Sequence, residues 1–306
     1  MNVQKLFPAM GTVHSIRLTG EKPLPTAERA KHLILELEQA LSVFDSGSEV
    51  ARLNRLPPGT WLRVSPHTFR LFQAAIHYGR LSHGAFDVTA GPLTALWREA
   101  RARSAVPNLR DLEWERQKVD YRGIRLDWVR RRVCLTGAGQ EVDFGGLAKG
   151  YALDCVRALL RRESITEAVV NLGGSVAVLG QEQSVGVRNP FDPGGAPLGV
   201  LNIQNCCVIT SGTYEQSFTA CGTVHHHILD PRTGWSARSG LCAVTLVGQR
   251  AAELDALATA AVVLGIPQTL PILKRQGIEA VFVSEQGKVF VTRGLQNRFQ
   301  FQMTSA

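Results

Sequence analysis

The chain has 306 residues, of which 44% are hydrophobic and 20% are charged, as is usual for a globular protein. Its net charge of +8 suits an anionic ligand, but no recognition motif for nucleic acid accompanies it, so we expect no nucleic-acid partner. We also expect no transmembrane segment and a cytoplasmic protein, because no stretch approaches roughly 18 apolar residues and the start has no signal-peptide pattern.

The first third of the chain is predicted to be rich in helices. Residues 12–19 alternate apolar and polar side chains, which indicates a strand. Apolar residues at helical spacing predict a helix over 26–44, with Thr26 as its N-cap. We predict three further helices here: one that Ser48 caps, one over 66–81 and one over 92–100. The charged, aperiodic stretch 101–116 is predicted to be a mobile connection.

The remainder of the chain is predicted to be rich in strands. These are expected over 124–127, 132–135, 168–172, 175–179, 184–188, 200–209, 226–229, 241–247, 280–284 and 288–292. Helices are expected between them over 147–162, 251–264 and 267–276. Adjacent strands joined by short polar turns predict an α+β fold, with largely antiparallel sheets packed with helices. We expect one domain over 1–306, with a helix-rich part over about 20–116 and a strand-rich part over about 117–300.

Residues 143–150, DFGGLAKG, join a predicted strand that ends at Val142 to a predicted helix that runs through Asp154. Their two glycines let backbone approach a ligand closely, and free N–H groups at the helix start suit an anion. Lys149 adds a positive charge at the same place. The spacing matches neither the P-loop nor the Rossmann motif. The alternative is a tight strand–helix turn in which glycine serves packing alone.

The apolar helix predicted over 251–264 carries a carboxylate and a hydroxyl. Asp255 and Thr259 stand at i and i+4, so both side chains face the same way. Oxygen ligands of this kind suit a hard cation such as Mg²⁺, which often takes only one or two carboxylates. The alternative is that Asp255 pairs with free amides or with Arg250, because a buried charge needs a partner.

Three consecutive histidines open the segment 225–234, HHHILDPRTG. Because a strand alternates its faces, His225 and His227 would share one side and His226 would face the other way. A triple-histidine metal site does not follow, whereas a two-histidine site with a distant third ligand stays open.

The segment 84–93, GAFDVTAGPL, places an aromatic residue beside the carboxylate of Asp87. That pair suits the edge of a planar ring, although capping by Thr89 is the alternative. Glycine turns, oxygen ligands, a histidine and a lysine together suit a ligand that contains a diphosphate and a ring.

Taken in order, these segments resemble the ApbE family of FAD:protein FMN transferases. The matching pieces are AMGT (9–12), SEVARLN (48–54), GAFDVTAGPL (84–93), DFGGLAKGYALD (143–154), NLGG (171–174), TSGTY (210–214, with Thr213 in place of an acid), HILDPRTG (227–234) and DALATA (255–260). Eight ordered motifs from residue 9 to residue 260 cover most of the chain.

The resemblance implies an ApbE-like, T-fold-like enzyme that binds FAD, uses Mg²⁺ and transfers the FMN moiety to a threonine hydroxyl of an acceptor protein, releasing AMP. The positions that match flavin-contacting residues are Met10, Phe44, Ala85, Phe86, Asp87, Asp143, Lys149 and Ile228. The positions that match metal ligands are Asp255 and Thr259, with backbone carbonyls at Gly146 and Ala258. His227 matches the histidine to which a catalytic role is assigned. Asp255 is also expected to be catalytic, as a ligand of the metal.

The chain departs from the family pattern at several positions. Phe44 stands where the family commonly has a stacking tyrosine, and Ser175 and Thr213 replace acids. Many members carry an export or lipoprotein signal, so the alternative location is periplasmic or attached to the inner membrane. The alternatives in function are hydrolysis of FAD to FMN and AMP, or non-catalytic FAD binding.

Overall fold

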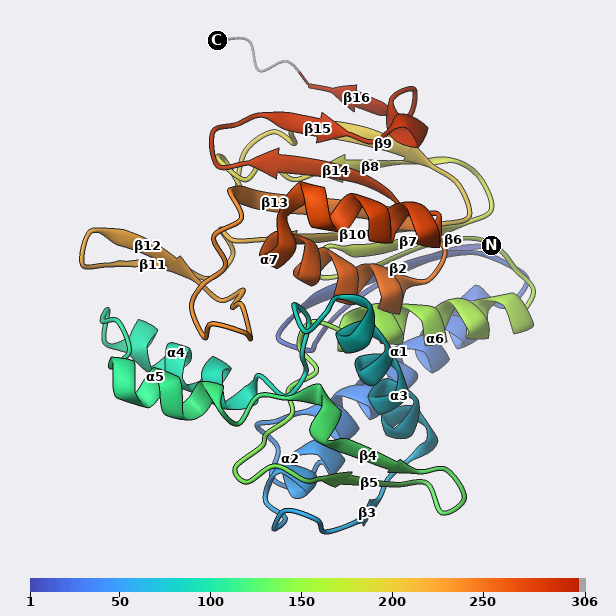
Figure 1. The fold of residues 1–306 in the computed structure, drawn as a ribbon. Helices are drawn as coiled ribbons and strands as arrows, with labels where there is room; N and C mark the ends of the chain where they lie inside the picture. Colours follow the sequence, from blue (N-terminus) through green and yellow to red (C-terminus); the bar gives the residue numbers. More distant parts are fainter. Residues whose placement is uncertain (303–306) are drawn as a thin grey trace. The chain divides into compact units, whose positions relative to one another are not determined.

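The computed structural model describes residues 1–302, which form two compact units (Figure 1). Within the described residues, unit 1 comprises 1–38, 149–214 and 240–302, and unit 2 comprises Gln39–Ala148 and Glu215–Ser239. Each unit is therefore assembled from stretches that are distant in sequence. The single domain over 1–306 stays a prediction, since two compact units can belong to one domain.

Unit 1 is built on an eight-stranded sheet in which every neighbouring pair is antiparallel. The strands, in sheet order, are β1 (Asn2–Ala9), β2 (Thr12–Gly20), β6 (Ile165–Leu172), β7 (Ser175–Leu179), β10 (Cys207–Gly212), β13 (Leu241–Gly248), β14 (Glu279–Ser284) and β15 (Val289–Val291). A smaller antiparallel sheet has the order β16 (Phe299–Phe301), β9 (Gly199–Ile203) and β8 (Gln183–Val187). Val178, Leu201 and Phe299 belong to one buried cluster that joins the two sheets.

The helices of unit 1 include α6 (Ala148–Arg162) and α7 (Ala251–Gln276), and α7 packs on β10 and β13. Helix α1 (Pro23–Leu41) runs across the boundary between the units, and the short η2 (Arg293–Leu295) precedes β16. Gly265 breaks α7 with φ 74° and ψ 173°, so the predicted pair of helices over 251–264 and 267–276 is confirmed.

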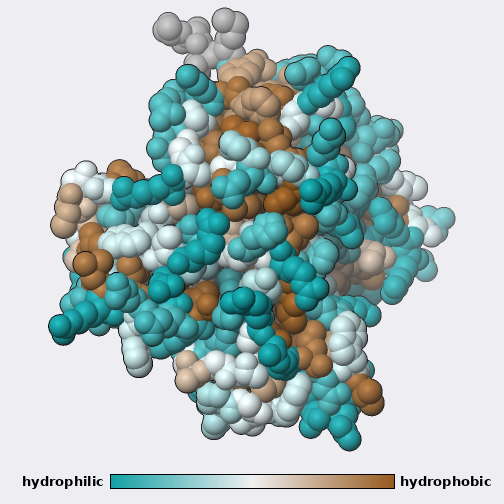
Figure 2. Space-filling view, in the orientation of Figure 1, coloured by the Kyte–Doolittle hydropathy of each residue, from teal (hydrophilic) through white to brown (hydrophobic). Residues whose placement is uncertain are grey.

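Helix α7 is also the one helix within residues 1–302 that is long and apolar enough to cross a membrane. However, 67% of its most apolar stretch is buried inside the protein, as in the core helix of a folded domain. On the face drawn in Figure 2, hydrophilic side chains predominate and hydrophobic residues show between them in patches. The apolar character of α7 is therefore explained by burial in the core.

Unit 2 contains most of the remaining helices and two small antiparallel sheets. Its helices are α2 (Glu49–Asn54), α3 (Pro66–Leu81), α4 (Gly91–Ala102), α5 (Leu109–Arg116) and η1 (Tyr121–Gly123). Its strands are β3 (Leu62–Arg63), β4 (Ile124–Asp127) and β5 (Arg132–Leu135) in one sheet, and β11 (Ser217–Ala220) and β12 (Thr223–His226) in another. Leu93, Trp97, Leu112 and Leu229 form a buried cluster.

The predicted α+β class with antiparallel sheets is confirmed, but several local predictions are wrong. Thr26 does not cap α1, because the helix begins at Pro23 and the Thr26 hydroxyl donates to the carbonyl of Lys22. Residues 101–116 are not a mobile connection: α5 forms there, with Asn108 as its cap and Leu112 buried. Tertiary burial of a single leucine does not produce a periodic sequence pattern.

Two strand predictions are also wrong in their extent. The stretch 200–209 contains parts of two strands, β9 and β10, separated by a turn at Asn205, whose φ is 51°. The strand expected over 226–229 lies earlier, because β12 ends at His226.

Gly150 lies in the first turn of α6, where there is no room for a side chain. A Cβ atom there would lie 2.4 Å from the carbonyl oxygen of Ala251 and 2.7 Å from the Cβ of Asp255. We therefore expect Gly150→Ala to lower the free energy of unfolding by roughly 1–3 kcal/mol, measured by urea denaturation. Gly194→Ala is the matched control, since its Cβ would have no neighbour within 4 Å. Equal denaturation midpoints for the two variants would contradict this close packing.

Candidate functional site

In unit 1, Asp255 is a buried carboxylate at the place where α7 meets α6. Its Oδ2 accepts a hydrogen bond of 2.9 Å from the backbone N–H of Gly150. Burial raises the pKa of Asp255, while the charge of Lys149 and the Gly150 N–H act in the opposite direction. The predicted alternative, pairing with free amides, is thus present, but Arg250 pairs with Glu253 instead.

Two hydroxyl oxygens follow one another from the backbone carbonyl of Asp255. The hydroxyl of Thr259 donates to the backbone carbonyl of Asp255 at 3.2 Å and lies 3.4 Å from the hydroxyl oxygen of Ser211 on β10. Ala258 is buried between the two predicted ligands on α7. The donor set of carboxylate, hydroxyl and carbonyl oxygens fits Mg²⁺ and does not fit a soft metal.

The β1–β2 turn of unit 1 presents Met10 and leads to a buried histidine. Met10 has a positive φ of 47°, and its N–H donates to a carboxylate oxygen of Glu38 at 2.6 Å. His14 is fully buried and packs edge-on against Phe7, with the two ring centroids 5.6 Å apart. Burial lowers the pKa of His14, and the charge of Lys149 lowers it further.

Unit 2 contains a cavity of about 310 Å³ that an aromatic ring and charged groups line. The ring of Phe44 is 79% exposed, and the guanidinium of Arg98 lies 5.2 Å from its centroid. The side chain of Asn54 bonds both the N–H and the carbonyl of Val142, at 2.8 and 2.9 Å. Asp143 completes this wall, and its carboxylate accepts from the N–H of Gly145 at 2.8 Å.

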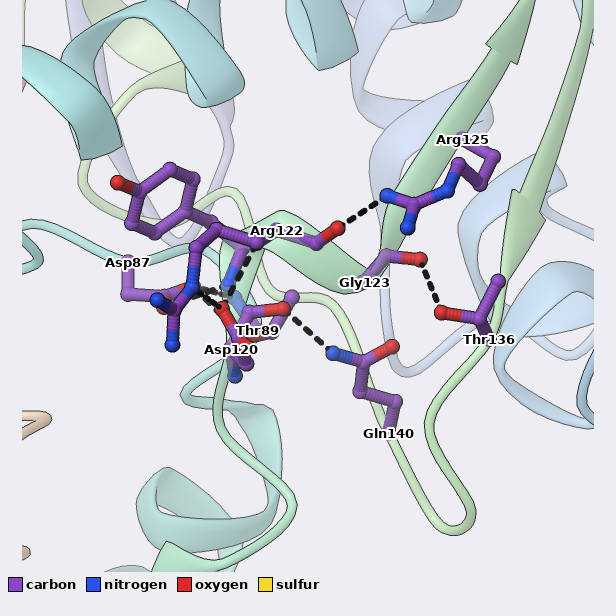
Figure 3. A network of polar contacts seen from close by, with 9 residues as sticks. Asp87, Thr89, Asp120, Arg122, Gly123, Arg125, Thr136 and Gln140 are labelled. Atoms are coloured by element: carbon purple, nitrogen blue, oxygen red, sulfur yellow. Dashed lines mark hydrogen bonds and ion pairs between the residues drawn. The ribbon is translucent and has the colours of Figure 1, made fainter.

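Asp87 lies at one end of a hydrogen-bond network in the same unit (Figure 3). One carboxylate oxygen accepts from the N–H and the hydroxyl of Thr89, at 2.8 and 2.7 Å, and the other accepts from the N–H of Tyr121 at 2.8 Å. The Thr89 hydroxyl in turn accepts from the N–H of Asp120 at 2.8 Å. Burial raises the pKa of Asp87 despite these bonds. Asp87 therefore holds the segment that carries the buried Ala85 and Phe86.

The three histidines do not form a common metal site. His225 is buried 5.1 Å from Trp97 and 5.6 Å from Phe218, measured between ring centroids, and a ring nitrogen of buried His226 lies 3.0 Å from the carbonyl oxygen of Ala237. Burial lowers the pKa of both rings. His227 is exposed after the end of β12, next to buried Ile228. The expected shared face of His225 and His227 is wrong, because the strand ends between them.

No group of three or more His, Cys, Asp or Glu side chains suited to a metal exists in residues 1–302, so a two-histidine site with a third such ligand is not supported. Unit 1 brings together Lys149, Asp255, Ala258 and Thr259, and unit 2 brings Phe44 and Asp143 together at its cavity. Unit 2 also contains Gly146, in the turn before α6.

Sequence reasoning did not single out Ser211, Arg98 or Asp154. Ser211 was part of a recognisable hydroxyl-rich segment, but only the pairing of the strands shows that it lies beside Thr259. Arg98 was one of several basic residues near the end of a predicted helix, and nothing in the sequence places it over Phe44. The part that Asp154 plays, described below, also depends on contacts between two helices.

Unit 1 thus places oxygen groups beside a lysine, unit 2 has a cavity lined by an aromatic ring, and the protein is of the α+β class. The model of the ApbE family matches residues 10–282. The chain belongs to the ApbE family.

Similar proteins and structures agree with this assignment. The FAD:protein FMN transferases of Treponema pallidum and Klebsiella pneumoniae are 30% and 34% identical over 312 and 274 residues, covering 94% and 89% of this chain and 86% of each relative. The crystal structure of the ApbE protein of Thermotoga maritima has a TM-score of 0.88 at 29% identity and covers 97% of this chain and 99% of that one. The crystal structure of the apo form of the flavinyl transferase ApbE of Pseudomonas stutzeri has a TM-score of 0.84 at 26% identity. It covers 99% of this chain and 98% of that one.

The buried ring of His14 predicts a pH dependence of stability. Its pKa in the folded protein lies below the ordinary value, so the unfolded chain binds the proton more tightly. The folded protein therefore has its full stability above about pH 6.5, where His14 is neutral in both states. It loses stability as the pH falls toward the pKa of His14 in the folded protein. We expect the free energy of unfolding to fall less for His14→Leu than for the wild type between about pH 7.5 and about pH 5, measured by urea denaturation.

Val13→Leu is the control, because it changes an exposed residue of the same strand and adds no titratable group. Its profile should parallel that of the wild type. If the His14→Leu profile were also parallel to the wild type, the described burial of His14 would not influence stability.

Proposed function

We propose that this protein is an FAD:protein FMN transferase that moves the FMN moiety of FAD onto an acceptor protein. The match to the ApbE family over residues 10–282 carries the proposal, because relatives named for this activity cover nearly the whole chain. The groups proposed below for the metal and the flavin ring are described for each unit separately.

The proposed metal is Mg²⁺, held by the carboxylate of Asp255, the hydroxyl of Thr259 and the carbonyl of Ala258. Gly146, a residue of unit 2, stays a prediction from the resemblance. The chemistry that a bound magnesium ion supplies is neutralisation of charge on the diphosphate. Lys149 adds a positive charge near Asp255, which favours both an ionised carboxylate and an anionic ligand.

The proposed acceptor group is a threonine hydroxyl. Its oxygen attacks the phosphorus of the FMN moiety, the bond to the bridging oxygen breaks, and AMP leaves with that oxygen. His227 is the proposed base that takes the hydroxyl proton, because its side chain is exposed and imidazole titrates near neutral pH.

The proposed contact for the isoalloxazine ring is the exposed face of Phe44. Stacking needs an aromatic face and no hydroxyl, so phenylalanine can serve in place of the tyrosine that the resemblance implies at this position. Two residues stand where the resemblance implies acids. The hydroxyl of Thr213 donates a hydrogen bond to the carbonyl of Cys242, and Ser175 is buried in β7.

Removing the carboxylate of Asp255 tests the metal and the reaction together. Wild-type protein is incubated with FAD, Mg²⁺ and a protein or peptide with an acceptor threonine, and the products are followed by mass spectrometry. We expect a covalent FMN adduct and AMP, and for Asp255→Ala a loss of roughly 10²-fold or more in the Mg²⁺-dependent rate. Glu163→Gln, a surface change on unit 1, is the control.

The alternative outcomes of this experiment are distinct. Free FMN and AMP without an adduct would show an FAD hydrolase, and bound, unchanged FAD would show a binding protein. Full retention of Mg²⁺-dependent turnover by Asp255→Ala would refute the metal assignment.

Replacing Phe44 tests the ring contact separately. An aromatic pair contributes about 0.5–1.5 kcal/mol beyond the area that it buries, so Phe44→Ala should weaken FAD binding by about tenfold, while Phe44→Tyr should bind as the wild type does. Fluorescence titration with FAD measures both affinities. Phe191→Ala, at another exposed phenylalanine, is the control. Unchanged affinity in Phe44→Ala would place the ring elsewhere.

A further inference from the structure

The first turns of α6 and α7 are capped by each other's carboxylates. Asp255 of α7 accepts from the N–H of Gly150 in α6, as described above. In return, the two oxygens of Asp154 in α6 accept from the N–H groups of Ala251 and Ala252 in α7, each at 2.9 Å. Gly150 and Asp154 are one turn apart, as are Ala251 and Asp255, so the two first turns run past each other in opposite directions.

Helix α7 depends on this external cap because it has none of its own. Its N-cap residue, Arg250, makes no side-chain cap hydrogen bond. The first N–H groups of a helix have no partner within the helix, and a carboxylate near them is stabilised by the helix dipole. Asp154 therefore satisfies two of the first N–H groups of α7.

The surroundings of Asp154 hold its carboxylate in place. Arg157, one turn further along α6, is buried; one of its guanidinium nitrogens lies 3.7 Å from Asp154 and donates to the carbonyl of Gln249. Burial raises the pKa of Asp154, and the two amides and Arg157 oppose that rise. The carboxylate is thus fixed from the α6 side and from the chain that leads into α7.

We propose that Asp154 is a positioning residue for the metal ligand Asp255. By fixing the first turn of α7 on α6, it sets the place of the Asp255 carboxylate one turn later. This inference rests on the proposed function, because it requires that Asp255 bind Mg²⁺. Asp154 itself faces two amides and is not a ligand.

The test compares two variants that each remove one negative charge from the same region. In Asp154→Asn the amide nitrogen cannot accept, so one of the two N–H groups of α7 loses its partner. Glu253→Gln is the matched control, since Glu253 lies in the first turn of α7 but pairs with Arg250 rather than with α6. Asp154→Ser, which keeps one acceptor, serves as a second variant if Asp154→Asn does not fold.

Binding of Mg²⁺ is measured without FAD, by calorimetric titration and by the rise in unfolding temperature as Mg²⁺ is added. Residues that orient metal ligands typically change affinity by 10–100-fold, so we expect Mg²⁺ binding to Asp154→Asn to weaken by about tenfold or more. Glu253→Gln should bind as the wild type does. In the transfer assay, high Mg²⁺ should restore the kcat of Asp154→Asn with an unchanged KM for FAD, but should not rescue Asp255→Ala.

Other results overturn the proposal in distinguishable ways. Equal Mg²⁺ affinity in wild type and Asp154→Asn would refute the positioning role while leaving the metal assignment intact. Equal weakening in Asp154→Asn and Glu253→Gln would show that loss of charge, and not of the cap, is responsible. Absence of Mg²⁺ binding by the wild type would refute the proposed metal and this inference together.

Discussion

The contact between the first turns of α6 and α7 places a carboxylate inside unit 1. Gly150 permits this contact, because any side chain there would collide with the backbone of Ala251. The buried charge of Asp255 is costly without partners, and the protein supplies one amide bond and one nearby lysine. These partners offset only part of the cost of burial, since the pKa of Asp255 remains raised.

In unit 2, segments without regular secondary structure line part of a cavity. Its strands are short, so few of its backbone groups are paired within sheets. Side chains form hydrogen bonds with other backbone groups instead. Asn54 fixes the residue before Asp143, Asp87 fixes the start of η1, and Gln140 bonds the carbonyl of Asp120 at 2.6 Å. Such bonds satisfy backbone groups that would otherwise lack partners. The hydrogen-bonded pair Asn54 and Val142 lines the same cavity as the exposed ring of Phe44.

Local sequence patterns predicted much of this structure. The helix over 66–81 and the strands over 124–127, 132–135 and 175–179 have the predicted bounds. Ser48 caps α2 as expected, with its hydroxyl oxygen 2.9 Å from the N–H of Ala51. These elements have local signals, because their apolar residues recur at the period of the element and their ends carry capping residues. Helix α5 and strand β16 lack such signals, and they form where tertiary contacts bury a few of their residues.

The sequence by itself determined the fold class, the family motifs and the residue types at the candidate site, since these follow from periodicity and from the order of short segments. Only the tertiary structure decided which groups meet. It separated the three histidines, paired Asp255 with Gly150, and placed Arg98 over Phe44. It also showed that Asp154 caps the helix that carries Asp255. The physical reason is that these contacts join residues up to about 105 positions apart, and their geometry depends on packing between elements, which no local pattern encodes.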